Sequence, residues 1–204
     1  MSAVAIRAER VGDEPAIHHL TAAAFRDVEH SDGSEPAIVD RLRELGHLAL
    51  SLVAADGQGA IIGHAAYSPV TIDGKDEAWF GLGPISVAPE HQRRGIGSAL
   101  IERGTAELRA KGARGIVLLG DPAYYSRFGF EHDPRLSYPG PPPEYFQRLV
   151  LAGETPAGTV CYSPAFGLAC GIRGGIVMKH LLVAIAAFLL LANSPSERAR
   201  RVDE

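Results

Sequence analysis

The sequence predicts an α/β protein of the α+β type, with a mixed, mostly antiparallel central sheet and helices on both of its faces. The antiparallel sheet is predicted by three apolar runs, at residues 48–55, 60–72 and 79–87. An Asp-Gly dipeptide separates each run from the next. Such dipeptides favour tight β-hairpins, so we expect three antiparallel strands in chain order. The helices are predicted by apolar residues that recur at helical spacing before and after these three strands. The expected helices span residues 14–26, 35–45 and 96–111.

Further elements surround this centre. The pattern predicts a first strand over residues 3–8, and the order of elements fits neither a Rossmann alternation nor a helical bundle. Gly104 falls on the apolar face of the helix at 96–111, which predicts close contact between that helix and the sheet. The remaining expected elements are a buried strand at 115–119, a short helix at 123–128 and late strands at 146–152 and 159–163.

Length and charge narrow the function classes. The 204 residues fit one domain, which we place at residues 3–166. The formal net charge of -4 argues against a nucleic-acid partner, because proteins that bind nucleic acid usually carry a basic excess. His18, His19 and His91 lack metal-ligand spacing, so we expect no metal. The N-terminus lacks the long apolar run of a secretion signal, and we expect a cytoplasmic protein that is a monomer or a homodimer.

The C-terminal segment, residues 167–204, differs from the rest of the chain. Residues 181–192 are almost wholly apolar but fall short of the roughly 20 residues that cross a bilayer, and an arginine-rich end follows. Three interpretations remain open: an extension from an altered stop codon or reading frame, a membrane-associating anchor, or a helix packed on the domain or a partner. We favour the first of these over membrane association.

A glycine-rich turn between a strand and a helix is the candidate for the chemistry. The strand ends at Val87, and the turn runs through Arg93 and Arg94 to Gly95 and Gly97, where the helix opens. Helix N-termini present unpaired N–H groups, glycines let an anion approach the backbone, and arginines add positive charge. The spacing fits neither a P-loop nor the dinucleotide-binding fingerprint. From the residues alone, a phosphate site and an ordinary turn are equal alternatives.

Two segments resemble the motifs of the GNAT acetyltransferases. Residues 87–100 read VAPEHQRRGIGSAL and are similar to motif A of that family, whose core is Q/R-x-x-G-x-G/A. Residues 120–130 read GDPAYYSRFGF and resemble motif B, a helix that ends in Y-x-x-x-G-F. Together with the run Ile62-Gly63-His64, they look most like the bacterial subgroup called YhbS-like. The resemblance covers about residues 3–166 and implies the GNAT fold.

The resemblance implies an acetyl-CoA site at this turn. In the family the pyrophosphate binds backbone N–H groups of the turn, and Gln92 occupies the first motif position. The preceding strand pairs with the pantetheine arm, which assigns backbone contacts to Ile85 and Val87. The N–H group of Val87 is then the expected donor to the thioester oxygen. The expected cofactor-binding positions of the turn are Arg93, Arg94, Gly95, Ile96, Gly97 and Ser98.

Tyr125 matches the tyrosine of motif B. The resemblance implies that it is the acid that protonates the departing thiolate, a task that requires a phenol held in place. The alternative is that its ring only packs on the sheet and that its hydroxyl binds the cofactor. Tyr124 is expected to point elsewhere, because adjacent helical positions lie about 100° apart.

The implied reaction is direct attack of a primary amine, on a small molecule or a peptide, on the acetyl thioester. The amine must first lose a proton, and the candidate bases are Glu29, Glu35, His64 and Glu77. Glu35 is better explained by a favourable charge at a helix N-terminus, and His64 by a hydrogen-bonded core histidine. The alternative function is a CoA-binding module or sensor without turnover.

Overall fold

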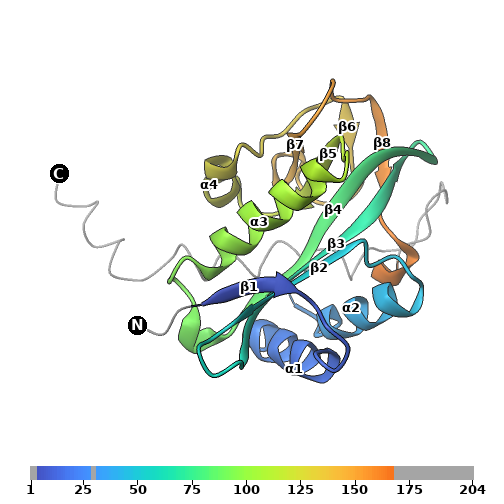
Figure 1. Cartoon of the computed structure of the whole chain (residues 1–204). Helices are drawn as coiled ribbons and strands as arrows, with labels where there is room; N and C mark the ends of the chain where they lie inside the picture. The colour runs from blue at the N-terminus through green and yellow to red at the C-terminus, as the bar shows by residue number, and fades with distance from the viewer. Residues whose placement is uncertain (1–3, 29–30, 168–204) are drawn as a thin grey trace.

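The computed structural model describes residues 4–28 and 31–167, which form a central sheet with helices on both faces (Figure 1). Six strands follow the order β1-β2-β3-β4-β5-β7, while β8 pairs with β3 and with β6. Neighbours along this path are antiparallel except β4 and β5, which are parallel. The strands are β1 (Ala5–Ala8), β2 (Leu50–Ala55), β3 (Ile61–Ile72), β4 (Lys75–Val87), β5 (Gly115–Leu119), β6 (Leu136–Ser137), β7 (Phe146–Val150) and β8 (Gly158–Cys161). The predicted fold class is confirmed.

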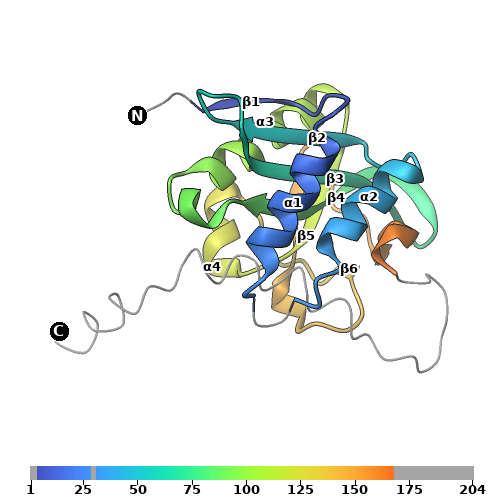
Figure 2. The same ribbon diagram turned by 90° about the horizontal axis from the view of Figure 1, so that it is seen from below.

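The helices divide between the two faces of the sheet. Helices α1 (Glu14–Phe25) and α2 (Glu35–Glu44) cover one face, and α3 (Ile96–Ala110) covers the other (Figures 1 and 2). The single turn of α4 (Pro122–Tyr125) lies beside the N-terminal end of α3. Each of these helices lies within one or two residues of its predicted range, except α4, which gives way to a 3₁₀ turn from Ser126 to Phe128.

The predicted hairpins are present with the predicted pairing. Asp73 and Gly74 both adopt positive φ, of 49° and 77°, and Ile72 pairs directly with Lys75 across them. This two-residue turn is tight, so β4 starts four residues before the predicted strand at Trp79. The strand β6 was not predicted, because two residues are too few to show a period.

Gly104 brings α3 close to the sheet, as predicted. A Cβ at this position would lie 2.2 Å from the Tyr67 hydroxyl of β3, so only glycine leaves room for that ring. Ile96, Leu100 and Leu108 are buried on the same helix face. The close approach fixes the first turn of α3, and therefore the glycine-rich turn, against the sheet.

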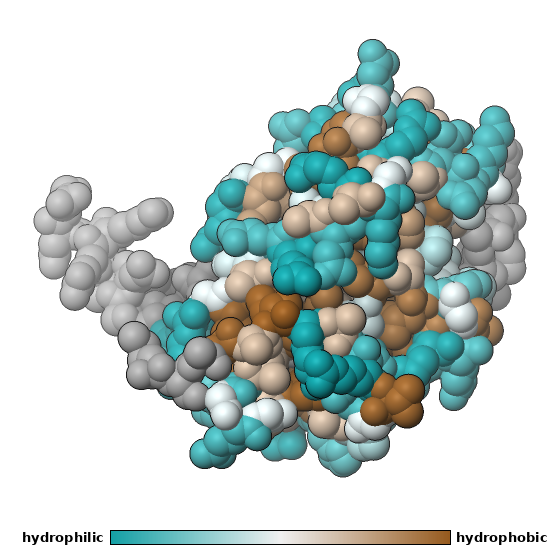
Figure 3. Space-filling model, in the orientation of Figure 1, coloured by the Kyte–Doolittle hydropathy of each residue, from teal (hydrophilic) through white to brown (hydrophobic). Residues whose placement is uncertain are grey.

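The side of the molecule that carries α3 is largely hydrophilic, with apolar side chains in small separate groups (Figure 3). Within residues 4–28 and 31–167, none of the helices is long and apolar enough to span a membrane. The interpretations of residues 167–204 concern a segment that, apart from Gly167, lies outside the described residues.

Candidate active site

The glycine-rich turn presents free backbone donors. Gly95 precedes the first turn of α3 in the left-handed conformation, at φ 81°, and Arg93 also has a positive φ of 60°. The helical ladder begins with the bond from the Ala99 N–H to the Gly95 carbonyl at 2.9 Å. The N–H groups of Ile96, Gly97 and Ser98 therefore have no partner within the helix. Alternating left- and right-handed backbone at a helix start forms a concave, positively polarised anion site.

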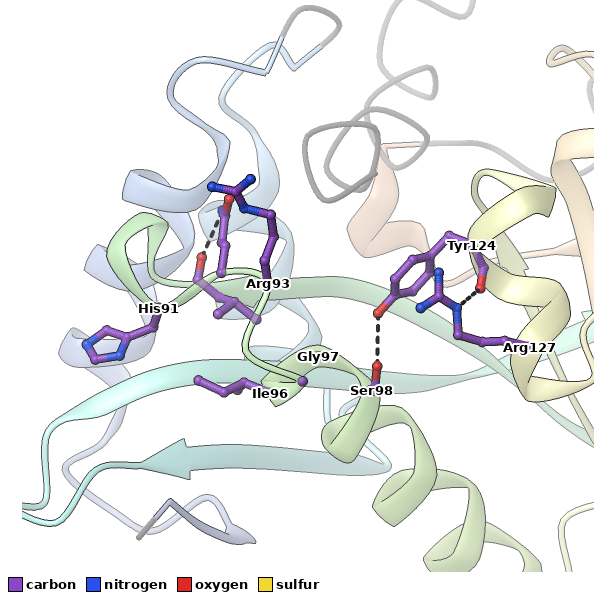
Figure 4. A pocket seen from close by; sticks show the side chains of 10 residues that line it. His91, Arg93, Ile96, Gly97, Ser98, Tyr124 and Arg127 are labelled. Atoms are coloured by element: carbon purple, nitrogen blue, oxygen red, sulfur yellow. Dashed lines mark hydrogen bonds between the residues drawn. The ribbon is translucent and has the colours of Figure 1, made fainter. Parts of the chain in front are cut away.

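A cavity of about 280 Å³ opens in front of this turn (Figure 4). Its lining joins the end of β4, the turn, the start of α3, and the segment that follows β5. His91, Tyr124 and Arg127 line it although the sequence did not predict them as site residues. The lining residues are Val87, His91, Gln92, Arg93, Gly95, Ile96, Gly97, Ser98, Tyr124 and Arg127.

The charged side chains of this lining are both arginines. Arg93 projects from the turn, and Arg127 lies across the cavity beyond Tyr124 (Figure 4). The Arg127 Nε donates to the Tyr124 carbonyl at 2.8 Å, and its guanidinium carbon lies 4.2 Å from the centre of the Tyr124 ring. These contacts hold a permanent positive charge at the mouth of the cavity. Arg94 is exposed and does not belong to this lining.

The strand β4 separates from β5 before it reaches the turn. The two strands pair only from Trp79 to Gly81, and the register of β4 against β3 then shifts between Leu82 and Ile85. Such a bulge bends a strand and ends its pairing on one side. Within the described part of the chain, the stretch of β4 from Leu82 to Val87 therefore has an edge that β5 does not cover.

The ladder on the other edge fixes which backbone groups face this gap. The Ala88 N–H donates to the Ile62 carbonyl at 3.0 Å, and Val87 and Ile85 lie one and three residues before Ala88. Because an antiparallel ladder alternates, the N–H and C=O groups of Val87 and Ile85 point away from β3 and into the gap. The Gln92 side chain already reaches this edge and donates to the Val87 carbonyl at 3.2 Å.

The two tyrosines of α4 occupy different parts of the site. The Tyr124 hydroxyl lies 3.4 Å from the Ser98 Oγ at the cavity wall (Figure 4). The expectation that Tyr124 points elsewhere was therefore wrong: its side chain lines the cavity, and its ring meets that of Tyr125 edge-on, with centres 5.1 Å apart. Tyr125 is only 3% exposed and packs edge-on against Phe130, with ring centres 5.9 Å apart.

Burial sets the ionisation of Tyr125. Desolvation raises the pKa of its phenol well above 10, and nearby Tyr124, Tyr67, Asp121 and Tyr162 raise it further. The hydroxyl therefore stays protonated at neutral pH. Tyr125 belongs to the main hydrophobic cluster of the protein, together with Tyr67 of β3 and Phe130.

The candidate bases have structural roles in this fold. Burial lowers the pKa of His64 to about 3, and its Nε2 lies 2.9 Å from the Ser51 Oγ, so it is a neutral core histidine. Glu77 pairs with Arg114 at 2.9 Å near the far end of β4, ten residues or about 33 Å from Val87. Glu29 lies outside the described residues.

Glu35 is the last of the candidate bases and is buried at the start of α2. It is 1% exposed, and desolvation raises the pKa of its carboxyl. Both carboxylate oxygens accept from the Ser31 Oγ, at 2.8 and 2.9 Å. This bond ties α2 to the loop before it, which favours a structural role.

The histidines form no metal site in the described ranges, 4–28 and 31–167, where no group of three His, Cys, Asp or Glu side chains is arranged to hold a metal ion. His18 contacts Asp40 at 2.7 Å, and His19 contacts the Pro15 carbonyl at 2.6 Å.

Comparison with known proteins gives the class that this fold and site define. A family model described as an acetyltransferase (GNAT) domain matches residues 5–132. The uncharacterised N-acetyltransferase YhbS of Escherichia coli K12 is 42% identical over 139 residues, which cover 66% of this chain and 80% of that protein. The chain belongs to the GNAT acetyltransferase family, and its resemblance to YhbS is confirmed.

Solved structures agree with this assignment. A GNAT family acetyltransferase from Brucella melitensis, in complex with acetyl-CoA, superposes with a TM-score of 0.73 at 46% identity, covering 81% of this chain and 99% of the other. The YhbS structure from E. coli, in complex with CoA, superposes with a TM-score of 0.75 at 36% identity, covering 82% and 94%.

Proposed function

We propose that residues 3–166 form a cytoplasmic N-acetyltransferase domain that transfers the acetyl group of acetyl-CoA to a primary amine of a small molecule or peptide. The observation that carries this proposal is that one cavity joins the start of α3 to the edge of β4 that β5 does not cover. Val87, at the end of that edge, lines the cavity together with Gly97 and Ser98 of α3. The relatives solved with acetyl-CoA and with CoA support it.

The residues present fit the chemistry of this co-substrate. The pyrophosphate would accept from the N–H groups of Arg94 to Ser98, with Arg93 and Arg127 balancing its charge. The pantetheine amides would pair with the backbone of Val87 and Ile85, like one more strand beside β4. Tyr124 and Ser98 would then form the wall beside the phosphates.

Acetyl-CoA would supply the acetyl group as an activated thioester. The ammonium group of the acceptor first loses one proton to solvent or a base. The amine nitrogen then attacks the carbonyl carbon, the C–N bond forms as the C–S bond breaks, CoA leaves as a thiolate, and the nitrogen releases a second proton. The N–H groups of Ile85 and Val87 face this edge, and the one nearest the thioester, assigned to Val87, would stabilise the charge that grows on its oxygen. No covalent intermediate with the protein is required.

Tyr125 would give its proton to the departing thiolate. Its phenol is a weaker acid than a thiol with a pKa near 8.5, so the transfer works only when the hydroxyl is held against the sulfur. The packing of its ring on Phe130 and Gly120 supplies that restraint: a Cβ at Gly120 would lie 2.2 Å from the ring. Tyr124, at the mouth of the cavity, is assigned to co-substrate binding instead.

The test is the release of free CoA thiol by the full chain, supplied with acetyl-CoA and a panel of primary amines. Amine-dependent release, with an acetylated amine found by mass spectrometry, is the expected result. Binding of acetyl-CoA without turnover across the panel would instead support a CoA-binding sensor.

A further inference from the structure

The contacts of Arg127 leave most of its guanidinium group free. Its Nε donates to the Tyr124 carbonyl at 2.8 Å, and its guanidinium carbon lies 4.2 Å from the centre of the Tyr124 ring. Within residues 4–28 and 31–167, Arg127 makes no other hydrogen bond and no ion pair, whereas Arg114 and Arg148 both pair with carboxylates. The two Nη groups are therefore available to an anion in the cavity that Arg127 lines.

A line of contacts leads from the glycine-rich turn to Arg127. The Ser98 Oγ, in the first turn of α3, lies 3.4 Å from the Tyr124 hydroxyl, and Arg127 packs on the ring of the same tyrosine (Figure 4). All three residues line one cavity, together with Gly97. This cavity therefore offers two places to an anion. One is the set of unpaired N–H groups at the start of α3, and the other is Arg127, one tyrosine side chain further away.

Acetyl-CoA also carries its negative charges in two places. Its pyrophosphate is attached to C5′ of the ribose and its third phosphate to C3′, so one sugar ring lies between them. The pyrophosphate suits the backbone N–H groups of a helix start. The 3′-phosphate is a monoester with about 1.5–2 negative charges at neutral pH, and an arginine fork pairs with such a group through two parallel hydrogen bonds. The two anions of the co-substrate thus match the two places in the cavity.

We propose that Arg127 binds the 3′-phosphate of acetyl-CoA and makes the site selective for CoA over nucleotide thioesters that lack this phosphate. This inference rests on the proposed function and adds to it the residue that selects the co-substrate. Arg127 acts on the pyrophosphate through its charge alone, whereas its Nη groups hydrogen-bond the 3′-phosphate. The contacts with Tyr124 hold the long side chain in place before the co-substrate arrives, so less conformational entropy is lost on binding.

The test compares acetyl-CoA with acetyl-3′-dephospho-CoA by isothermal titration of the full chain, and it needs no acceptor. The wild type should bind acetyl-CoA at least about tenfold more tightly, as expected for hydrogen bonds between charged groups. Arg127→Gln should bind acetyl-CoA at least about tenfold more weakly than the wild type, but acetyl-3′-dephospho-CoA less than about threefold more weakly. Equal affinities of the wild type for the two ligands, or an equal loss for both in Arg127→Gln, would overturn the proposal.

Two matched variants separate this contact from a general change of charge. Arg93→Gln removes an arginine of the turn and should weaken both ligands by the same factor, so the preference for acetyl-CoA stays. Arg109→Gln removes an exposed arginine in the last turn of α3, thirteen residues or about 20 Å along the helix from Ile96, and should leave both affinities unchanged. Loss of the preference in either variant would mean that net charge sets it, and would overturn the proposal.

A second measurement uses the wild type alone. ADP and 3′-phospho-ADP carry the nucleotide end of CoA without the pantetheine arm, and 3′-phospho-ADP should compete with acetyl-CoA at least about tenfold better. Equal competition would count against the 3′-phosphate contact and overturn the inference. If acetyl-CoA binds the wild type without this preference, only the inference fails; if acetyl-CoA does not bind the well-folded protein, the proposed function fails with it.

Discussion

A substitution at Gly95 is the sharpest test of whether the glycine-rich turn binds the pyrophosphate of acetyl-CoA. Its φ of +81° lies in the left-handed region, and nothing lies within 4 Å of the place where a Cβ would stand. Any substitution therefore adds backbone strain of about 1–2 kcal/mol but no steric clash. Gly95 lines the cavity, so a new side chain at this position stands beside the proposed phosphate site.

The substitution Gly95→Glu adds a negative charge beside the proposed pyrophosphate. Two unit charges about 5 Å apart repel by about 3 kcal/mol at an effective dielectric constant of about 20. Screening at physiological salt reduces this to about half. Acetyl-CoA should therefore bind Gly95→Glu about 10- to 150-fold more weakly than the neutral variant Gly95→Gln, which carries the same strain.

Isothermal titration with acetyl-CoA measures this difference, which should shrink as salt is added. The matched control is Gly74→Glu in the turn between β3 and β4, where φ is +77° and nothing lies within 4 Å of a Cβ. It carries a similar backbone strain far from the loop and should leave affinity unchanged. Equal affinities for the two Gly95 variants, or an equal loss in Gly74→Glu, would refute the assignment.

Three further predictions follow from the geometry and the shifted pKa values. Tyr125→Phe should lower kcat more than tenfold with little change in acetyl-CoA affinity, whereas Tyr124→Phe should mainly weaken affinity; steady-state kinetics separate the two, and an unaltered kcat for Tyr125→Phe removes its acid role. Burial raises the pKa of Glu35, so its carboxyl binds a proton more tightly in the folded protein than in the unfolded one. This proton binding stabilises the fold below the ordinary pKa of the carboxyl, and the stabilisation is lost as the pH rises. Thermal unfolding should then show Glu35→Gln to be more stable than the wild type at pH 7 and equal to it near about pH 4; a constant difference would contradict this. Hydrogen bonds from Arg135 and Arg148 hold the pKa of Asp133 well below its ordinary range, so the stability they give is present at neutral pH and lost in acid. Asp133→Asn should cost about 1.5–3 kcal/mol at pH 7, a loss that narrows below about pH 4, and a pH-independent loss would count against the ion pairs.

The parts of this protein that the sequence could predict have a local signal. The hairpin at Asp73-Gly74, the periodicity of α3 and the close approach at Gly104 each depend on a few adjacent residues, and the structure has all three. Gly95 and Gly97 could be placed at the cavity for the same reason.

What the sequence could not predict depends on contacts between distant segments. Tyr124 lines the cavity, although the 100° spacing of adjacent helical positions predicts that it points elsewhere. A helix of one turn has no period from which the side that faces the cavity could be derived. Arg127 is held at the site by its hydrogen bond to the Tyr124 carbonyl and by its packing on the Tyr124 ring. Tyr138 and Tyr162 lie far apart in the sequence, and the pairing of β6 with β8 brings their segments together.

The most direct test of the central claim is the thermal unfolding of the full chain with and without acetyl-CoA. A ligand at about 100 times its dissociation constant stabilises the native state by about 2.7 kcal/mol, which corresponds to about 5–11 °C for a chain of this size. A shift of this order, reduced to about half or less in Gly95→Glu at the same acetyl-CoA concentration and kept in Gly74→Glu, is the predicted result. A well-folded protein whose unfolding temperature does not respond to acetyl-CoA would contradict the account.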